Sequence, residues 1–327
     1  MSGDLLASFL QSKIPTLSLS LLMDAMLGEP PMKLHLTVLS GKMIESLERK
    51  LNYDGWRRFK GSFAALLTVL TFTLTTLLLL RTLRVASPIL HLFFSAFILK
   101  STFAVKSMDQ HVKPISKALQ QGNLPEARRL LSRVSRRNVS HLDERLISSG
   151  AVEAVAEGTV DGLISPLFFY FILDVPGAVM FRVVNTLDSI IGYREEPYRE
   201  FGWLSAKLDT VLNFAPARFT SLLILLTGFK GLRRNLSFLM GNHHGTSSVN
   251  AGWPLAAMAA RLKVKLEKKG HYIIGGEFKN PCWRDVDAAL KVMKASAAWF
   301  LAASLLINLL LRKTGTFGAE SLVLQLI

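Results

Sequence analysis

The stretch GSFAALLTVLTFTLTTLLLL, residues 61–80, decides the fold class because it contains twenty successive residues without a charge. A helix rises about 1.5 Å per residue, so a run of this length spans a hydrocarbon core of roughly 30 Å. Residues 295–311 are nearly as clear a candidate for a membrane-spanning helix. Residues 85–99, 163–181 and 212–229 are weaker, since each contains a proline, a histidine or a charge, and residues 5–10 with 17–27 form a further candidate. The sequence predicts an all-α, polytopic integral membrane protein with five or six membrane-embedded helical elements, forming a single domain over residues 1–327.

The distribution of charge supports this fold class. Half of the 327 residues are hydrophobic and the net charge is +15, with charges and apolar residues in separate blocks. Lys and Arg collect in residues 33–60, 100–145 and 230–291, and such segments face the cytoplasm in membrane proteins. Basic cytoplasmic loops in a multi-pass protein of the cell membrane account for most of the charge, and binding of phosphate or carboxylate ligands is the alternative for a smaller share of the basic residues. Binding to nucleic acid is not predicted, because no basic face with interleaved aromatic residues and no known module is present.

Residues 182–209 do not follow this pattern, since their four basic residues are outweighed by five acidic ones. A literal count of six spans places this segment outside the cell. The run Asp174-Val175-Pro176-Gly177 is a turn signal inside residues 163–181. It predicts a broken or re-entrant element, which returns residues 182–209 to the cytoplasmic side.

A basic run lies in the second cytoplasmic segment. Five arginines, at positions 128, 129, 133, 136 and 137, have helical spacing beside apolar residues. This pattern predicts one amphipathic helix through Arg137 at the membrane surface.

Carboxylates stand close to the apolar sequence of the central segment. Glu153, Glu157 and Asp161 follow one another at i, i+4 spacing, which places them along one stripe of a helix. One interpretation is a solvated helix face with Arg145 or Arg182 as partners. The other is a site for Mg²⁺, which is held by one or two carboxylates together with substrate phosphates.

Polar residues continue into the next apolar stretches. Asn185 and Asp188 share a helix face near Thr186, and these side chains form either a hydrogen-bonded core network or part of a site. Asp209 and Arg218 extend the pattern, and an arginine in an apolar segment requires an anionic partner or ligand. A further polar, glycine-bounded loop, residues 241–253, has backbone amides that can bind phosphate, although it contains no Walker pattern.

The order of these residues resembles one known family, the adenosylcobinamide-phosphate synthases (CobD/CbiB), which are integral membrane proteins of cobalamin biosynthesis. The resemblance is specific in the central segment and weaker across most of the remaining chain. It rests on Glu153, Ala156-Glu157, Thr159-Val160-Asp161-Gly162, Pro166-Leu167-Phe168, Asn185-Thr186-Leu187-Asp188-Ser189, Gly192-Tyr193, Tyr198, Phe201-Gly202, Ala206, Asp209 and Pro216-Ala217-Arg218, with echoes at Leu27-Gly28-Glu29-Pro30, His35 and Ser248-Val249-Asn250-Ala251-Gly252-Trp253.

The resemblance implies an amide-forming ligase that joins adenosylcobyric acid to aminopropanol or its phosphate, with ATP and Mg²⁺ required. The corrinoid and the amine are then substrates, and the lipid bilayer is a partner. A homo-oligomer or a complex with other cobalamin-assembly membrane proteins stays open. Glu157, Asp161 and Asp188 are the expected catalytic residues and metal ligands. The expected substrate-binding residues are Glu153, Arg182, Asn185, Thr186, Tyr193, Asp209, Arg218 and Asn250.

The sequence also departs from the family pattern. Asn138, Thr210 and Leu255 stand where the family has acidic residues, which removes three potential ligands. A non-enzymatic membrane sensor or scaffold of the same family would explain these losses. A transporter would use intramembrane charges as a pathway, but no internal repeat supports that alternative.

Overall fold

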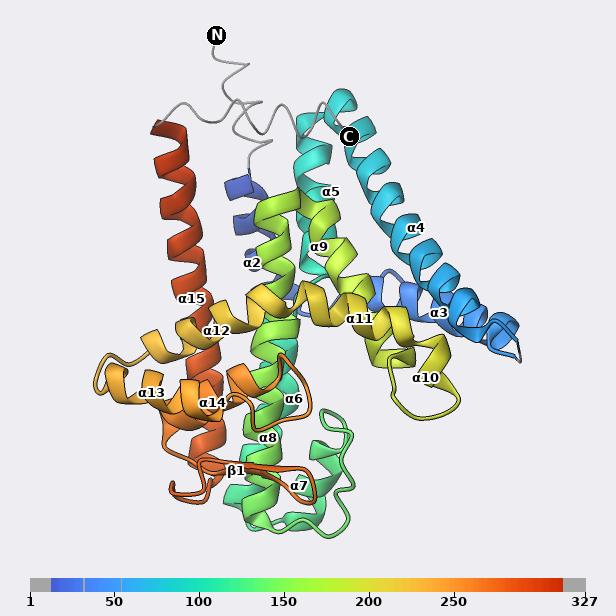
Figure 1. The fold of residues 1–327 in the computed structure, drawn as a ribbon. Helices are drawn as coiled ribbons and strands as arrows, with labels where there is room; N and C mark the ends of the chain where they lie inside the picture. The colour runs from blue at the N-terminus through green and yellow to red at the C-terminus, as the bar shows by residue number, and fades with distance from the viewer. Residues whose placement is uncertain (1–12, 32, 54, 314–327) are drawn as a thin grey trace.

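A computed structural model describes residues 13–31, 33–53 and 55–313, so the candidate membrane residues 5–10 lie outside the described part. Its architecture is all-α (Figure 1), as predicted. The described helices are α2 (Lys13–Leu27), α3 (Leu36–Leu51), α4 (Arg57–Ala86), α5 (Pro88–Lys100), α6 (Val105–Gln120), α7 (Leu124–Leu131), α8 (Glu144–Thr159), a π-helical turn (Val160–Ile164), α9 (Ser165–Ile191), α10 (Tyr198–Phe201), α11 (Trp203–Leu212), α12 (Phe214–Leu226), α13 (Leu232–Asn242), α14 (Gly252–Leu262) and α15 (Trp283–Lys313).

Three described helical stretches are long and apolar enough to cross a membrane: Arg57–Ala86, Pro88–Gln120 and Glu144–Ile191. The bent pair α11 and α12, which meet at 44°, adds a fourth if it is one span. Helix α4 contains the predicted run 61–80, and Phe63, Leu70 and Leu78 on it are each more than half exposed. Apolar side chains with this exposure suit contact with lipid. The chain is therefore a membrane protein.

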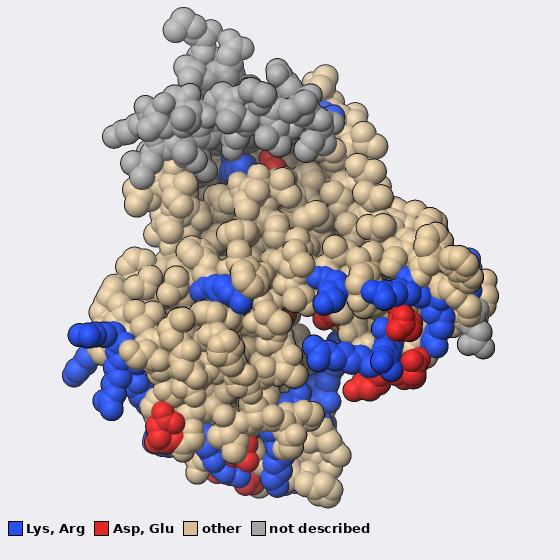
Figure 2. Space-filling model, viewed as in Figure 1, with Lys and Arg blue, Asp and Glu red and all other residues tan. Residues whose placement is uncertain are grey.

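Figure 2 shows that apolar and charged side chains occupy different halves of one face of the molecule. The upper half, over α4, α5 and the upper part of α15, is almost wholly free of Lys and Arg, whereas the lower half carries most of the charged side chains. Helices α3, α11 and α12 lie across the boundary, at a large angle to α4 and α15 (Figure 1). The apolar helices thus form a membrane part, and the charged lower part corresponds to the predicted cytoplasmic segments.

Helix α9 is a hairpin of two arms, which confirms the predicted break at residues 174–177. Leu173 and Asp174 have non-helical backbone angles, and Asp174 has a φ of +59°. The Asp174 carboxylate accepts a hydrogen bond of 2.7 Å from the backbone N–H of Val175. Figure 1 shows the chain rising through α8 into α9 and descending again beyond the break. Both ends of the hairpin consequently lie on the same side, and residues 182–209 return to the level of α8.

The lower part of the molecule has its own buried core. Helices α6, α8, α14 and α15 pack together around fully buried side chains that include Ile115, Ile147 and Val286. Strands β1 (Leu266–Lys268) and β2 (Tyr272–Ile274) form an antiparallel hairpin, with Leu266 opposite Ile274, and β1 contacts α8. This hairpin brings a late segment of the chain against the carboxylate-bearing helix.

The prediction of one basic helix through Arg137 is wrong. Helix α7 ends at Leu131, and Arg133, Arg136 and Arg137 lie in the turns and loop that follow. Helical continuation would stack these like charges on one another, whereas the loop allows Arg137 to reach a buried carboxylate on α8. The run is consequently part of a polar site and not a membrane-surface helix.

Candidate functional site

Two cavities meet in the lower part of the molecule, where α8, the descending arm of α9 and the loop before α14 come together. Their volumes are about 570 Å³ and 230 Å³. Glu157, Asp161 and Asp188 line both cavities, and so do Ser248 and Ala251. The three predicted catalytic carboxylates therefore form a wall that the two cavities share, which we call the carboxylate wall.

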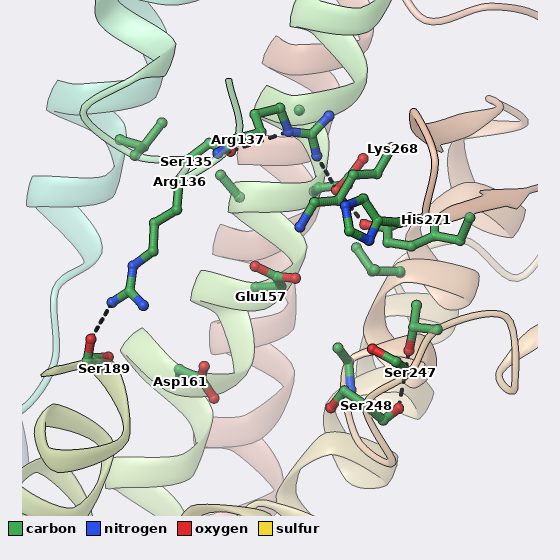
Figure 3. Close-up of a pocket in the computed structure, with 18 of the residues that line it drawn as sticks. Ser135, Arg136, Arg137, Glu157, Asp161, Ser189, Ser247, Ser248, Lys268 and His271 are labelled. Atoms are coloured by element: carbon green, nitrogen blue, oxygen red, sulfur yellow. Dashed lines mark hydrogen bonds and ion pairs between the residues drawn. The ribbon is translucent and has the colours of Figure 1, made fainter. Parts of the chain in front are cut away.

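The local fold explains how the carboxylate wall forms. Glu157 lies on α8 and Asp161 in the π-helical turn that follows, while Asp188 comes from the descending arm of α9. A π-turn inserts one extra residue per turn and is frequent at functional sites. Within the described residues, the three carboxylates accept no hydrogen bond and form no ion pair. Figure 3 shows Glu157 and Asp161 projecting from α8 and the turn toward the open space.

Glu153 has a different environment from the other acids on this stripe. Its side chain is 5% exposed and pairs with Arg137, which is 8% exposed. The Tyr272 hydroxyl also donates a hydrogen bond to it, and Ser149 donates another at 3.1 Å. Glu153 lines the larger cavity, but it is held by the protein on several sides.

Arg145 and Arg182 are the partners expected for this stripe. Glu153 pairs with neither of them, whereas the charge of Arg182 acts on Asp161 at the other end of the stripe. Arg145 instead pairs with Glu267 at 3.2 Å, and Arg182 donates to the backbone oxygen of Thr102 at 2.6 Å. On the β-hairpin, burial and the charge of Glu153 raise the pKa of Tyr272 well above its usual value. Tyr272 therefore remains a hydrogen-bond donor throughout the neutral range.

Basic side chains line the larger cavity beside the carboxylate wall. Arg136 donates a hydrogen bond of 2.6 Å to the backbone oxygen of Ser189. Lys268 and His271 reach the cavity from the β-hairpin, on the side of Glu157 away from Arg136 (Figure 3). Figure 2 shows a hollow with blue side chains around it on this face. The arrangement can bind an anion close to the carboxylates.

Sequence reasoning did not assign Arg136, Arg137, Lys268, His271 or Tyr272 to the site. The helical spacing of Arg136 and Arg137 with the preceding arginines predicts a membrane-surface helix and does not point to the site. The strands of the β-hairpin have only three residues each, too few for a period-two pattern to stand out. The one available signal is the glycine at position 270, which stands between the largely charged residues 263–269 and the short apolar run 272–274.

The smaller cavity is lined by amides and a carboxylate besides the carboxylate wall. Asp209 accepts hydrogen bonds from Asn213, at 3.1 and 3.2 Å, and from Asn185, at 3.3 Å. Asn250 donates to the backbone oxygen of Thr210 at 2.8 Å. Asp209 and Asn250, both predicted site residues, thus lie on the same cavity as the three catalytic candidates.

The remaining predicted residues lie around the cavities without lining them. Arg218 donates to Asn250 Oδ1 at 3.3 Å, and Asn185 accepts from Arg182 at 3.2 Å while it donates to Asp209. The Thr186 hydroxyl bonds within its own helix, to the backbone oxygen of Arg182. The exposed Tyr193 ring lies 5.1 Å from the Arg136 guanidinium. Thr186 and Tyr193 are therefore the predicted site residues with the least direct place in this geometry.

Comparison with known proteins gives a family for this geometry. The family model described as CobD/Cbib protein matches residues 17–301. The chain belongs to the CobD/Cbib family. The matched range contains the two cavities and every predicted site residue.

Curated members of the CobD/Cbib family align with most of the chain. A probable cobalamin biosynthesis protein CobD from Thermoplasma volcanium is 38% identical over 283 residues, covering 85% of this chain and 91% of the relative. The Pyrococcus furiosus protein of the same name is 39% identical over 285 residues, with 85% and 92% covered. The cobalamin biosynthesis protein CobD of Halalkalibacterium halodurans is 36% identical over 292 residues, with 86% and 92% covered. No solved structure is significantly similar to the chain. The chain is therefore a CobD-family protein of cobalamin biosynthesis.

The Mg²⁺ expected for this CobD-family chain can be compared with the donor set. Among the described residues, no group of three or more His, Cys, Asp or Glu side chains is placed to hold a metal ion. Mg²⁺ does not need such a group, because one or two carboxylates and substrate phosphates are its usual ligands. Glu157, Asp161 and Asp188 form no hydrogen bond or salt bridge with a described residue and face the cavities, so they fit this shared mode of binding.

Proposed function

We propose that the chain is an adenosylcobinamide-phosphate synthase. In this proposal it joins a carboxylate of adenosylcobyric acid to aminopropanol or its phosphate in an ATP- and Mg²⁺-dependent ligation. It acts in the cell membrane as a multi-pass protein. The observation that carries the proposal is the carboxylate wall, whose three unpaired acids come from both sides of a helical hairpin and face a cation-lined cavity.

The chemistry of amide formation explains why such a site is needed. A carboxylate does not condense with an amine until one of its oxygens becomes a leaving group. Transfer of the γ-phosphoryl group of ATP to that oxygen releases ADP, and attack by the amine then forms the C–N bond and breaks the C–O bond to phosphate. Mg²⁺, when bound, would supply charge neutralisation on the phosphates.

The residues of this chain would bind and orient the substrates and would move protons. The amine substrate arrives as an ammonium ion, so it must lose one proton before attack and another as the amide forms. Asp188 and Asp161 lack hydrogen-bond partners among the described residues, which leaves them available to accept a proton or share a metal ion. Arg136 and Lys268 would attract the anionic groups. A corrinoid is much larger than either cavity, so only its reacting side chain would enter.

The test is a reconstituted reaction with purified protein in detergent or nanodiscs. It contains adenosylcobyric acid, ATP, Mg²⁺ and either aminopropanol or its phosphate, and mass spectrometry detects the cobinamide product. The unsubstituted chain should give an ATP-dependent product. Asp188→Asn, which keeps the side-chain shape and removes the charge, should abolish it. Glu200→Gln, at an exposed position on α10, serves as the matched control and should retain full turnover.

Other outcomes contradict the proposal in distinct ways. Corrinoid binding without any product would favour a membrane sensor or scaffold. Flux of corrinoid into proteoliposomes without condensation would favour a transporter. Near-normal turnover by Asp188→Asn would remove that residue from the catalytic set even if the ligase activity stands.

A further inference from the structure

The two cavities differ in the charge of the side chains that line them beyond the carboxylate wall. The larger cavity has the cationic residues Arg136, Arg137 and Lys268, together with His271. Among the described residues that line the smaller cavity there is no Lys, Arg or His. Its further lining consists of an acid, amides, a hydroxyl and apolar groups: Asp209, Asn213, Asn250, Thr210, Val160, Ala217 and Pro254.

We propose that the two cavities are separate subsites for the two small co-substrates. The larger cavity binds the phosphate groups of a nucleoside triphosphate, and the smaller one binds the ammonium group of a small primary amine. The carboxylate wall stands between them. This assignment rests on the proposed function, and it goes beyond it by giving each substrate a place and a set of contacts.

The cations of the larger cavity are of two kinds. Arg137 is occupied by the protein, because it pairs with Glu153 and donates to Ser135 at 3.2 Å and to the backbone oxygen of Glu267 at 3.3 Å. Arg136 and Lys268 form no ion pair with any described acid. Arg137 is thus a positioning residue. Lys268, and Arg136 through the donors that its bond to the Ser189 backbone oxygen leaves, would contact phosphate from two sides of the cavity. Arginine and lysine are the usual side-chain ligands of phosphate groups.

The size and lining of the larger cavity suit a nucleotide. Its volume of about 570 Å³ lies within the range of roughly 300–1,000 Å³ that is common for ligand pockets. Thr246, Ser247 and Ser248 add hydroxyl and backbone groups on the side of the loop before α14. An anion bound here would have the carboxylate wall directly beside it, and Glu157, Asp161 and Asp188 would hold a metal ion that neutralises the phosphate charge.

The smaller cavity offers an ammonium ion the opposite environment. Asp209 is held by two amide side chains and forms no ion pair with a described cation. A largely buried carboxylate is costly unless hydrogen bonds or a cation compensate its charge, and here the amides supply only part of that compensation. A bound ammonium group would supply that cation and donate hydrogen bonds to Asp209 and to the carboxylate wall.

The amides around this cavity are already fixed in place. Asn213 donates to Asp209 and accepts from the Ser165 hydroxyl at 2.7 Å, and Asn250 is bonded on both sides, to Thr210 and Arg218. Val160, Ala217 and Pro254 add apolar surface for a short carbon chain. A volume of about 230 Å³ is too large for a bare ion and is below the usual range for drug-sized ligands. A small amino alcohol fits both the size and the mixed lining.

The test compares binding of the two co-substrates to reciprocal variants. Isothermal titration calorimetry of the full chain in nanodiscs measures binding of a non-hydrolysable ATP analogue with Mg²⁺ and, separately, of 1-amino-2-propanol. The double variant Arg136→Gln/Lys268→Gln should weaken the nucleotide by about tenfold or more and leave the amine unchanged. Asp209→Asn should weaken binding of the amine by about tenfold or more and leave binding of the nucleotide unchanged. Arg133→Gln and Glu200→Gln, both at exposed positions outside the cavities, should change neither.

A second variant tests whether the loss of amine binding in Asp209→Asn comes from the cavity itself and not from misfolding. Thr210→Val keeps the shape of a residue that lines the smaller cavity and removes one polar group there. Its affinity for the amine should fall while its melting temperature and its nucleotide affinity match those of the unsubstituted chain. Discrimination between short and longer amino alcohols should also change, since this residue borders the subsite.

Three results would overturn the assignment. One is equal loss of nucleotide and amine binding in Asp209→Asn. Another is undiminished nucleotide binding in the Arg136/Lys268 double variant. The third is Mg²⁺ alone binding in a manner that depends on Asp209 and excludes the amine. Binding is measured without turnover, so reciprocal losses in a chain that makes no amide would support the subsites while refuting the ligase.

Discussion

The rings of Phe169 and Phe181 stack across the two arms of α9, with centroids 5.6 Å apart and planes 13° from parallel. One residue belongs to the rising arm and the other to the descending arm, so their contact defines the re-entrant hairpin. Asp161 and Asp188 reach the same cavities because the arms are held together in this way. The hairpin is thus the element that assembles the carboxylate wall.

The first prediction concerns the sidedness of this hairpin. In a Cys282→Ser background, Lys113→Cys and Arg199→Cys should react with a membrane-impermeant thiol reagent from the same side. Val85→Cys, near the end of α4, should be reached only from the other side. Labelling of intact and inverted vesicles measures this. A hairpin that crossed the membrane as one straight span would place positions 113 and 199 on opposite sides.

Close packing within the hairpin gives the second prediction. A Cβ added at Gly177 would lie 2.5 Å from Leu173 Cβ and 2.6 Å from the backbone oxygen of Phe169. Gly177→Ala should therefore lower the free energy of unfolding by about 1–3 kcal/mol, the usual cost of overpacking. Thermal unfolding in detergent is the measurement. Gly162→Ala is the control, since no atom lies within 4 Å of its added Cβ, and equal effects at both positions would contradict the prediction.

The buried pair of Arg137 and Glu153 gives the third prediction. Arg137→Gln leaves a buried carboxylate without its cation, and removal of one partner of such a pair costs about 3–5 kcal/mol. The double variant Arg137→Gln/Glu153→Gln should recover most of this loss. Denaturant unfolding followed by fluorescence checks both.

A matched control for this pair exists at the surface. Arg129→Gln breaks the exposed pair with Glu126, which should cost far less stability, because solvent screens the two charges. If the Arg137 and Arg129 variants lose similar stability, burial does not govern the contribution of the Arg137 pair.

The fourth prediction is a pH dependence of stability from Glu29, in the loop between α2 and α3. Burial acts to raise the pKa of Glu29, but the hydrogen bond from His35 at 2.7 Å and the charge of Lys100 outweigh it and lower that pKa below its ordinary value of 4.5. The ionised form is therefore favoured in the folded state. The stability that ionised Glu29 contributes is complete above the pKa of Glu29 in the unfolded chain. It is lost as the pH falls through the lowered pKa of Glu29 in the folded chain.

Melting temperatures measured between pH 7 and pH 3 test this dependence. The unsubstituted chain should lose stability over the acidic part of the range, and Glu29→Gln should lose less of it. Glu45→Gln, at an exposed position on α3, should behave like the unsubstituted chain. An unchanged acid profile in Glu29→Gln would exclude Glu29 as its source.

Local sequence signals were sufficient for α4 and for the break within α9. The uncharged run 61–80 predicts α4 because only length and hydropathy are involved, and Asp174 to Gly177 predict the break because turn chemistry is local. The i, i+4 spacing of Glu153, Glu157 and Asp161 correctly places all three on one cavity, even though a π-turn intervenes.

The partners of these acids could not be predicted in the same way. Glu153 meets Tyr272 across 119 residues of chain, and no spacing rule connects α8 to the β-hairpin. Arg137 seemed helical because its neighbours are periodic, but its burial against Glu153 is a tertiary contact that overrides the pattern. Lys268 and His271 also reach the site through a tertiary contact. The strands of their β-hairpin are too short to give a recognisable sequence pattern.

The re-entrant hairpin also links the carboxylate wall to biogenesis. Glu157 and Asp161 precede the hairpin tip in the chain and Asp188 follows it, so the three acids meet only when the two arms lie side by side. Formation of the hairpin during membrane insertion is consequently the step that completes the carboxylate wall.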